Sequence, residues 1–183
     1  QGQHPTQSLA DLLPIKKRFG RLDDISVAIA GDLDKGRVVH SLIYLLSKFR
    51  NVTMYLVAPS FARIKSDIRE HLLEDERKKN GIAFFESSDI REVAPLVDVF
   101  YQTRPQKERD TPGFDSWDGE GFFELNDEVA RSMRPDAIIM HPLPRTAEMP
   151  LDVDNCKQAI CFKEQLDSGI YTRMALLTMV VPH

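Results

Sequence analysis

Arg104 and Gln106 follow the apolar stretch Val99–Tyr101, which is typical of a buried strand because polar and apolar residues do not alternate in it. In open α/β sheets ligands bind at the carboxyl ends of the strands, so both side chains are expected at a binding edge. The Arg104 guanidinium matches a carboxylate or a phosphate, and the Gln106 amide adds a donor and an acceptor. Pro105 restricts the backbone between them. The pattern predicts an anion site; a solvated charge cluster after a strand is the alternative.

The turn from Gly31 to Arg37 is a second candidate anion site, because it joins a predicted strand, 25–30, to a predicted helix, 37–49. Such a turn presents free backbone N–H groups and the positive end of a helix. Its GxxxxG spacing resembles a P-loop, but Arg37 and Val38 stand where Lys and Ser or Thr are required, and the chain has no GxGxxG pattern. Both nucleotide interpretations are therefore rejected. Arg37 at a helix start predicts a negative ligand or side chain opposite it.

The segment His141–Arg145 follows the predicted strand 137–140 and contains two prolines that flank Leu143. The prolines force the backbone out of regular strand pairing, and either X–Pro bond is a candidate for the cis form. Such a loop directs carbonyl oxygens outward as hydrogen-bond acceptors; an ordinary proline-rich strand exit is the alternative. The segment 110–121, rich in Asp, Gly and Pro, is predicted to be a long loop beside the anion site, either a lid or a flexible surface loop.

These groups must be positioned by a regular alternation of strands and helices. Strands are predicted at 25–30, 52–59, 82–85, 99–103 and 137–140, and helices at 4–20, 37–49, 61–79, 89–97, 126–133 and within 155–181. The first helix has the apolar stripe Leu9, Leu12, Leu13 and Phe19, with Thr6 and Gly20 as caps, and the last helix has the stripe Tyr171, Met174, Leu177 and Val181. A strand that alternates with a helix five times predicts a parallel sheet with helices on both faces, an α/β fold.

Length and composition limit the possible classes of protein. The 183 residues are 42% hydrophobic and 28% charged, which fits one soluble globular domain, with or without appendages. The formal net charge of −4 argues against nucleic-acid binding, and no apolar run is long enough to span a bilayer. Cys156 and Cys161 have no metal-ligand spacing and the histidines form no metal-binding pair, so no metal is expected. The chain begins without Met and directly on a motif, which predicts a fragment or a cleaved piece.

Four motifs in this order, His4–Gln7, Gly36–Leu42, Thr103–Arg109 and His141–Arg145, closely resemble the second half of the aspartate carbamoyltransferase catalytic chain. The resemblance covers nearly the whole chain. It implies a five-stranded parallel sheet with helices on both faces, the second domain of the aspartate/ornithine carbamoyltransferase fold. It also implies a crossover helix at 1–20, an aspartate-binding domain at 21–153, and a carboxyl-terminal segment at 154–183 whose helix packs toward the carbamoyl-phosphate domain.

The resemblance assigns roles to residues of both substrate subsites. It implies that His4 hydrogen bonds the carbamoyl carbonyl and stabilises the oxyanion, as the catalytic residue. It implies that Gln7 and the main-chain oxygens of Pro142 and Leu143 bind the carbamoyl amino group, with a cis bond between Leu143 and Pro144. The carboxylates and the amino end of aspartate are assigned to Arg37, Arg104 and Gln106. Residues 107–121 resemble the mobile loop of the family.

The implied reaction is attack of the α-amino group of L-aspartate on carbamoyl phosphate, which gives N-carbamoyl-L-aspartate and phosphate for pyrimidine biosynthesis. No cofactor is implied. The family further implies a homotrimer with shared active sites, with regulatory subunits or fused pathway domains as additional partners, in the cytoplasm or in a plastid. The phosphate-gripping segment of the first domain is absent, so the isolated chain is expected to be inactive. The segment 162–169 is one residue longer than the family pattern.

Two other functions compete with this interpretation. Ornithine carbamoyltransferase is expected to carry His-Cys-Leu-Pro where this chain has His141-Pro142-Leu143-Pro144, and a cationic substrate side chain would gain nothing from Arg104. The second alternative is a non-catalytic module that binds a dicarboxylate or a partner chain. The mass of the purified parent protein would separate a module from a larger enzyme.

Overall fold

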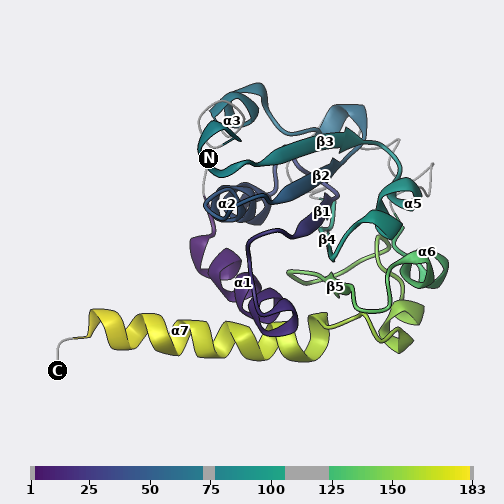
Figure 1. Cartoon of the computed structure of the whole chain (residues 1–183). Coiled ribbons are helices and arrows are strands. Elements are labelled where there is room, and N and C mark those ends of the chain that lie inside the picture. The colour runs from purple at the N-terminus through teal and green to yellow at the C-terminus, as the bar shows by residue number, and fades with distance from the viewer. Residues whose placement is uncertain (1–2, 72–76, 106–123, 182–183) are drawn as a thin grey trace.

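The computed structural model describes residues 3–71, 77–105 and 124–181, which form an α/β domain around one sheet (Figure 1). The sheet is parallel and five-stranded, with the order β3-β2-β1-β4-β5. The strands are β1 Ser26–Ala30, β2 Thr53–Val57, β3 Ala83–Ser87, β4 Val99–Gln102 and β5 Ile138–Met140. The predicted fold class is therefore confirmed.

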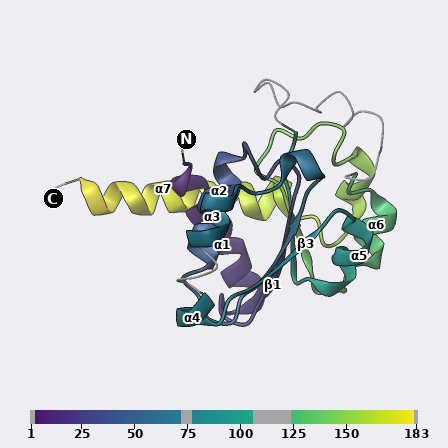
Figure 2. The same ribbon diagram turned by 90° about the horizontal axis from the view of Figure 1, so that it is seen from above.

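Helices cover both faces of the sheet, because each strand places alternate apolar side chains on opposite sides. Figures 1 and 2 show α1 (Pro5–Phe19) and α2 (Arg37–Leu46) on one face and α5 (Ile90–Val93) and α6 (Asp127–Ser132) on the other. The first face packs Val27 and Ile29 of β1 against the helices, and the second packs Ala28 and Ala30. Both faces are thus buried at the central strands β1 and β4, as expected for a parallel sheet with crossover helices, whereas the edge strand β3 is partly exposed.

The sheet grows in both directions from β1. The chain passes outward from β1 to β2 and β3, and then returns to place β4 and β5 on the other side of β1. Such a reversal of strand order opens a crevice at the carboxyl ends of the two central strands, here β1 and β4. The loops that follow β1, β4 and β5 meet there.

The first helix differs from its prediction at its start and on its buried face. His4, and not Thr6, is the N-cap, because the His4 side chain accepts a hydrogen bond from the backbone N–H of Gln7. Gly20 ends the helix in the left-handed conformation, as predicted. The buried face contains Ser8, Asp11, Leu12 and Ile15, whereas Leu9 of the predicted stripe is 37% exposed. Two polar residues, Ser8 and Asp11, therefore occupy part of the helix face that was predicted to be apolar.

The single helix predicted at 61–79 is wrong for the described residues. The chain forms a 3₁₀ turn, Ser60–Ala62, and two short helices, α3 (Ser66–His71) and α4 (Arg77–Asn80), with 72–76 outside the described residues. Arg63 is extended, and the carbonyl oxygen of Ala62 accepts hydrogen bonds from the backbone N–H groups of Leu33 and Asp34, at 3.0 and 3.1 Å. This carbonyl fixes the turn after β1 instead of serving a helical hydrogen bond, so tertiary contacts override local helix propensity.

The carboxyl-terminal helix α7 (Leu166–Val180) begins directly after a π-helical turn, Cys161–Gln165. In this turn the N–H of Gln165 donates to the carbonyl of Ile160, five residues earlier, at 3.1 Å. A π-helical turn contains one more residue than an α-helical turn. It is therefore the kind of local structure expected where the segment 162–169 has one residue more than the family pattern. The first part of α7 packs against α1, and both views show its far end projecting beyond the body of the molecule.

The remaining short elements lie around the second face of the sheet. The 3₁₀ turn Ala94–Leu96 continues α5, and a further 3₁₀ turn, Leu151–Asn155, packs beside α6. Asp89 caps α5 by accepting from the N–H of Arg91, as predicted, and Asn126 caps α6 by accepting from the N–H of Val129.

Candidate functional site

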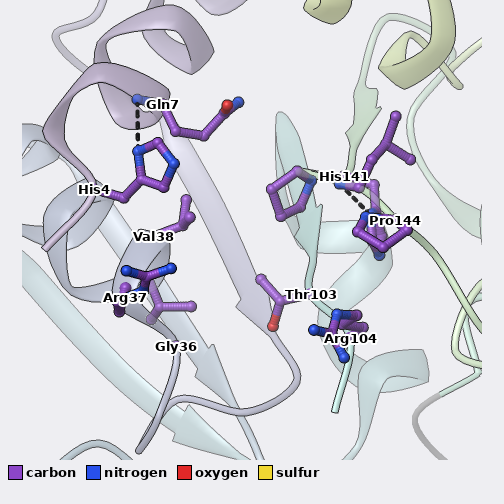
Figure 3. Close-up of a pocket in the computed structure, with 12 residues that line it drawn as sticks. His4, Gln7, Gly36, Arg37, Val38, Thr103, Arg104, His141 and Pro144 are labelled. Carbon is purple, nitrogen blue, oxygen red and sulfur yellow. Dashed lines mark hydrogen bonds between the residues drawn. The ribbon is translucent and has the colours of Figure 1, made fainter. Parts of the chain in front are cut away.

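A cavity of about 290 Å³ lies at the carboxyl ends of the central strands and beside the start of α1. Its walls come from α1, from the start of α2, and from the residues that follow β4 and β5 (Figure 3). The lining residues are His4, Gln7, Gly36, Arg37, Val38, Val39, Thr103, Arg104 and His141–Pro144. All of the predicted site residues except one therefore meet at one cavity; Gln106, like the predicted loop 107–121, lies outside the described residues.

The turn between β1 and α2 is held rigidly, and this places Arg37 at the cavity. Gly31 has φ +121°, and a Cβ there would lie 2.3 Å from the Thr103 carbonyl oxygen, so the position requires glycine. The Asp32 carboxylate accepts from the N–H of Lys35 at 2.9 Å, and the buried His40 ring contacts the Leu33 carbonyl oxygen at 2.8 Å. Arg37 then begins α2, whose first turn contains no acidic residue. The exposed guanidinium and the positive helix end together favour an anion.

Arg104 approaches the same cavity from the other side of the switch point. Thr103 extends the pairing of β4 with β1, because its N–H and its hydroxyl both donate to the Ala30 carbonyl, at 2.8 and 3.0 Å. The half-buried Arg104 follows, and its guanidinium donates to the Pro105 carbonyl at 3.3 Å. Figure 3 shows Arg37 and Arg104 on opposite sides of Thr103. The cavity thus combines two guanidinium groups held by different elements.

His4 presents a defined tautomer to the cavity. Its Nδ1 accepts from the backbone N–H of Gln7 at 3.4 Å, and the Thr6 hydroxyl lies 3.3 Å from the same nitrogen. The backbone N–H of His4 donates to the Ser41 hydroxyl of α2 at 2.9 Å, which ties the residue to the neighbouring helix. A neutral imidazole whose Nδ1 accepts carries its proton on Nε2. His4 can therefore donate a hydrogen bond through Nε2.

The loop after β5 has the backbone form that its two prolines suggested. The bond between Leu143 and Pro144 is cis, as predicted, and Leu143 has φ +55°, an uncommon conformation for a bulky side chain. The Leu143 N–H donates to His141 Nδ1 at 2.9 Å, and His141 Nε2 lies 3.0 Å from Glu148 Oε1, with both side chains buried. Since Nδ1 accepts, the Nε2–H donates to the carboxylate. The Glu148–His141 pair therefore supports the unusual Leu143 backbone.

Glu148 is a carboxylate held in its charged form. Burial acts to raise the pKa of Glu148, but the hydrogen bonds from His141 and Thr146 outweigh it and lower the pKa to about 2. Thr146 contributes both its N–H and its hydroxyl. The loop is anchored further along by Arg145, whose guanidinium makes a two-pronged contact with Asp154, at 2.5 and 2.7 Å, and lies 4.5 Å above the Phe162 ring.

Sequence reasoning missed a buried polar cluster behind the cavity. Asp11 is fully buried, and its carboxylate accepts from Gln7 Nε2 at 2.9 Å, Tyr101 Oη at 2.6 Å and Gln165 Nε2 at 2.7 Å. Gln165 Oε1 in turn accepts from the backbone N–H of His141 at 2.9 Å. Burial raises the pKa of Asp11, and these three hydrogen bonds act against that rise. The only sequence signal was an Asp one helical turn from Gln7, beside Leu12 of the predicted apolar stripe.

Residues 3–71, 77–105 and 124–181 contain neither a metal site nor a membrane-spanning helix. Within them, no cluster of three or more His, Cys, Asp or Glu side chains is arranged to hold a metal ion. In the same residues, no helix has the length and apolarity needed to cross a bilayer. Cys156 and Cys161 are both free thiols.

The fold and the site define a class of protein: a parallel α/β domain with a cavity, lined by two arginines, at a topological switch point. Comparison with known proteins makes this specific. Residues 23–180 match the family model described as aspartate/ornithine carbamoyltransferase, Asp/Orn binding domain. The chain belongs to this family.

Individual relatives agree with the family match. Aspartate carbamoyltransferase 1 of Pisum sativum, described as chloroplastic, is 43% identical over 98% of this chain and 45% of its own length. The aspartate carbamoyltransferase catalytic subunit of Methanocaldococcus jannaschii is 42% identical over 98% of this chain and 56% of its own length. The aspartate transcarbamoylase structure from Trypanosoma cruzi with carbamoyl phosphate has a TM-score of 0.91 and 35% identity, and covers 99% of this chain and 57% of that one. The chain spans about half the length of the curated relatives it matches.

Proposed function

We propose that this chain supplies the aspartate-binding half of an aspartate carbamoyltransferase site. One observation carries the proposal: Arg37 and Arg104, held by different elements, line the same cavity as His4, whose Nε2 is a hydrogen-bond donor. A dicarboxylate with a nucleophilic amino group needs two fixed cations and a neighbouring electrophile. Arg37 and Arg104 bind the two carboxylates, and Gln106 is proposed to assist them at the amino end.

The carbamoyl group lies on the His4 side of the cavity in this proposal. His4 donates from Nε2 to the carbamoyl oxygen and stabilises the negative charge that develops there. Gln7 uses its Nε2 on Asp11, so its Oε1 is left to accept from the carbamoyl amino group, together with the carbonyl oxygens of Pro142 and Leu143. His4 is the proposed catalytic residue, because it is placed to contact the atom on which charge develops.

The proposed reaction joins the two substrates without a cofactor. The α-amino nitrogen of L-aspartate forms a bond to the carbamoyl carbon, and a tetrahedral intermediate places a negative charge on the oxygen facing His4. The bond from carbon to the phosphate oxygen then breaks, a proton passes from the amino nitrogen to the departing phosphate, and N-carbamoyl-L-aspartate and phosphate leave. Fixed geometry and charge stabilisation supply the rate acceleration. The phosphate end is bound outside residues 1–183, so the chain alone is proposed to be inactive.

Aspartate is favoured over ornithine as the amino-acid substrate. A guanidinium at the side-chain end of the cavity attracts a carboxylate and repels the ammonium group of ornithine. The loop after β5 has proline at position 142, and the curated relatives described above are named aspartate carbamoyltransferases. The T. cruzi relative has been solved with aspartate and phosphate and with N-(phosphonacetyl)-L-aspartate. These findings support aspartate as the substrate and carbamoyl aspartate as the product.

The wider organisation of the protein is proposed from the family. Residues 1–20 are the crossover helix to a carbamoyl-phosphate domain, 21–153 the aspartate-binding domain, and 154–183 a segment whose helix packs toward that other domain. Catalytic chains are proposed to form a homotrimer with shared sites, with regulatory subunits or fused pathway domains as further partners. The cytoplasm, or a plastid if the source is a plant, is the proposed compartment.

The proposal is tested by calorimetric titration of the chain with L-aspartate or succinate, with and without carbamoyl phosphate. We expect weak binding that the change Arg104→Ala abolishes, because the remaining guanidinium holds only one carboxylate. Arg91→Ala, an exposed arginine on α5, is the matched control and should bind like the original chain. If the original chain binds neither dicarboxylate nor N-(phosphonacetyl)-L-aspartate, residues 1–183 form no aspartate site by themselves and act as a non-catalytic module.

A further inference from the structure

The buried cluster around Asp11 connects two parts of the cavity that are far apart in the chain. Gln165 is the connecting residue: its Nε2 donates to Asp11 at 2.7 Å and its Oε1 accepts from the His141 N–H at 2.9 Å. Asp11 lies on α1, one turn after Gln7, whereas His141 begins the loop that contains Pro142 and Leu143. Both hydrogen-bonding ends of one buried amide are thus used between these two walls.

The chemistry of a carboxylate fixes the orientation of Gln7. An amide side chain can present either its NH₂ or its oxygen to a ligand, and a half-turn about the last bond exchanges them. Asp11 can only accept while it is charged, and its Oδ1 already faces Gln165, so it binds the NH₂ end of Gln7 and turns Oε1 away from itself. The Tyr101 hydroxyl occupies Oδ2 and keeps the carboxylate from rotating.

The same cluster fixes the opposite wall. Gln165 holds the N–H of His141 at the end of β5, and the His141 ring, bound to Glu148, receives the N–H of Leu143. The backbone N–H groups of His141 and Leu143 therefore point away from the cavity. Gln7 and the loop after β5 therefore turn hydrogen-bond acceptors toward the position proposed for the carbamoyl amino group. The donors of the cavity, His4 Nε2 and the two guanidinium groups, belong to other lining residues.

We propose that Asp11 and Gln165 are positioning residues that turn only acceptors toward the carbamoyl amino group, and so select an NH₂ group over a methyl group or a carboxylate oxygen at that position. The inference rests on the proposed function for the placement of the carbamoyl group. It goes further by assigning the choice between carbamoyl phosphate and acyl phosphates to two residues that do not touch the ligand. Acetyl phosphate, in which a methyl group replaces the NH₂, is the discriminating comparison.

The first test needs no ligand. Amide hydrogen exchange is measured by NMR on the chain, for the original sequence and for Gln165→Met, which keeps the side-chain length but removes both hydrogen bonds. We expect exchange at His141 and Leu143 to become roughly tenfold faster or more, since the lost bond protects this loop. Exchange at Ile29 in the central strand should stay unchanged. Unaltered exchange at His141 and Leu143 would overturn the coupling between the walls.

The second test measures discrimination. Affinities for carbamoyl phosphate and acetyl phosphate are compared, and the original chain should prefer carbamoyl phosphate by roughly tenfold, the value of a hydrogen bond made to a buried site. Asp11→Leu and Gln165→Met should reduce this ratio toward one. Asp11→Asn should restore it, because the asparagine oxygen can still accept from Gln7 while its NH₂ donates to Tyr101.

A control separates positioning from general stability. Ser168→Ala removes a buried hydrogen bond to the Glu164 carbonyl in the same segment, at 2.7 Å, without touching the cluster, and should lower the melting temperature but keep the ratio. A ratio that falls equally in Ser168→Ala would assign the effect to loss of stability and overturn the proposal. If the chain binds neither phosphate compound, the proposed selectivity fails for residues 1–183, whereas the proposed function is decided separately by the dicarboxylate titration. The hydrogen-exchange result still decides the coupling between the walls.

Discussion

Individual residues at the cavity are fixed mainly by hydrogen bonds that determine which atom carries a proton. His4 and His141 both accept a backbone N–H at Nδ1, and both therefore carry the proton on Nε2. Their uses differ: the Nε2–H of His141 is consumed by the buried Glu148, whereas His4 lies half-buried at the cavity. The imidazole of His141 thus supports the loop after β5, whereas the imidazole of His4 can donate a hydrogen bond into the cavity.

Glu148 makes a pH-dependent contribution to stability. Its pKa of about 2 in the folded protein lies below the ordinary value of 4.5, so the contribution is complete above pH 4.5 and is lost as the pH falls toward 2. We expect Glu148→Gln to lose roughly 2–3 kcal/mol of the free energy of unfolding at neutral pH. The difference between the two proteins should narrow between pH 4.5 and 2, as measured by urea unfolding. A difference that is constant with pH would contradict the charged pair; Glu92→Gln, at an exposed position, is the control.

Secondary-structure elements determine how closely the two central loops approach. Gly31 brings the turn after β1 against the Thr103 backbone, and no other residue type leaves room for that carbonyl. The close contact holds the start of α2 beside the end of β4, and with them Arg37 and Arg104. One glycine therefore sets the separation of the two guanidinium groups.

Gly31→Ala is expected to destabilise the protein and to weaken succinate binding together. The new Cβ would lie 2.3 Å from the Thr103 oxygen, and alanine is strained at φ +121°. We expect a loss of about 2–3 kcal/mol or more from the combined strain and overlap. Gly20→Ala provides the comparison, because φ is +70° there but nothing lies within 4 Å, so only the backbone cost of about 1 kcal/mol applies. Thermal unfolding of both variants measures the difference, and equal losses would contradict the role of the contact.

Most of the elements were predictable from sequence because apolar runs and glycine turns are local signals. The five strands, the Gly20 cap and the Asp89 cap all followed from neighbouring residues. The prolines left two X–Pro bonds open as cis candidates, and the family resemblance assigned the cis form to the bond between Leu143 and Pro144. The break in the segment 61–79 did not, since it depends on the Ala62 carbonyl serving residues of another turn.

The site was predictable only in part, for the same physical reason. Motifs placed His4, Gln7, Arg37, Arg104 and the loop at 142–143 at one cavity. The support from Asp11, Tyr101 and Gln165 was not predictable, because a buried hydrogen bond between distant residues leaves no periodic pattern in the sequence. Asp11 on the buried face of α1 was a signal that a buried partner must exist.

At the scale of the whole molecule, α7 carries many large apolar side chains that are exposed. Met174 and Leu177 are 58% and 60% exposed, and Tyr171 and Met179 are exposed as well. Apolar side chains lie on several sides of this helix, so no single face can turn them all toward the body of the domain. Surface of this kind favours association with another protein surface.

We therefore expect the chain to associate in solution. Sedimentation velocity should show species larger than a monomer or aggregation, and the double change Met174→Lys with Leu177→Lys should reduce it by removing apolar surface at the exposed end of α7. Thr178→Lys, a polar position on the same helix, should leave the association unchanged. A dilute, monodisperse monomer of the original chain would contradict this expectation.

The hydrogen bond between Gln165 and Asp11 joins residues 154 positions apart, and this has a consequence for the order of folding. While the chain is being synthesised, α1 can form early, but the Asp11 carboxyl lacks one of its three donors until the carboxyl-terminal segment emerges. A buried carboxyl with an incomplete set of donors is unfavourable, so α1 is not expected to reach its final packing before that point. Contacts of such long range also form slowly. We therefore expect ligand binding to be regained last during refolding, only after the whole domain has folded.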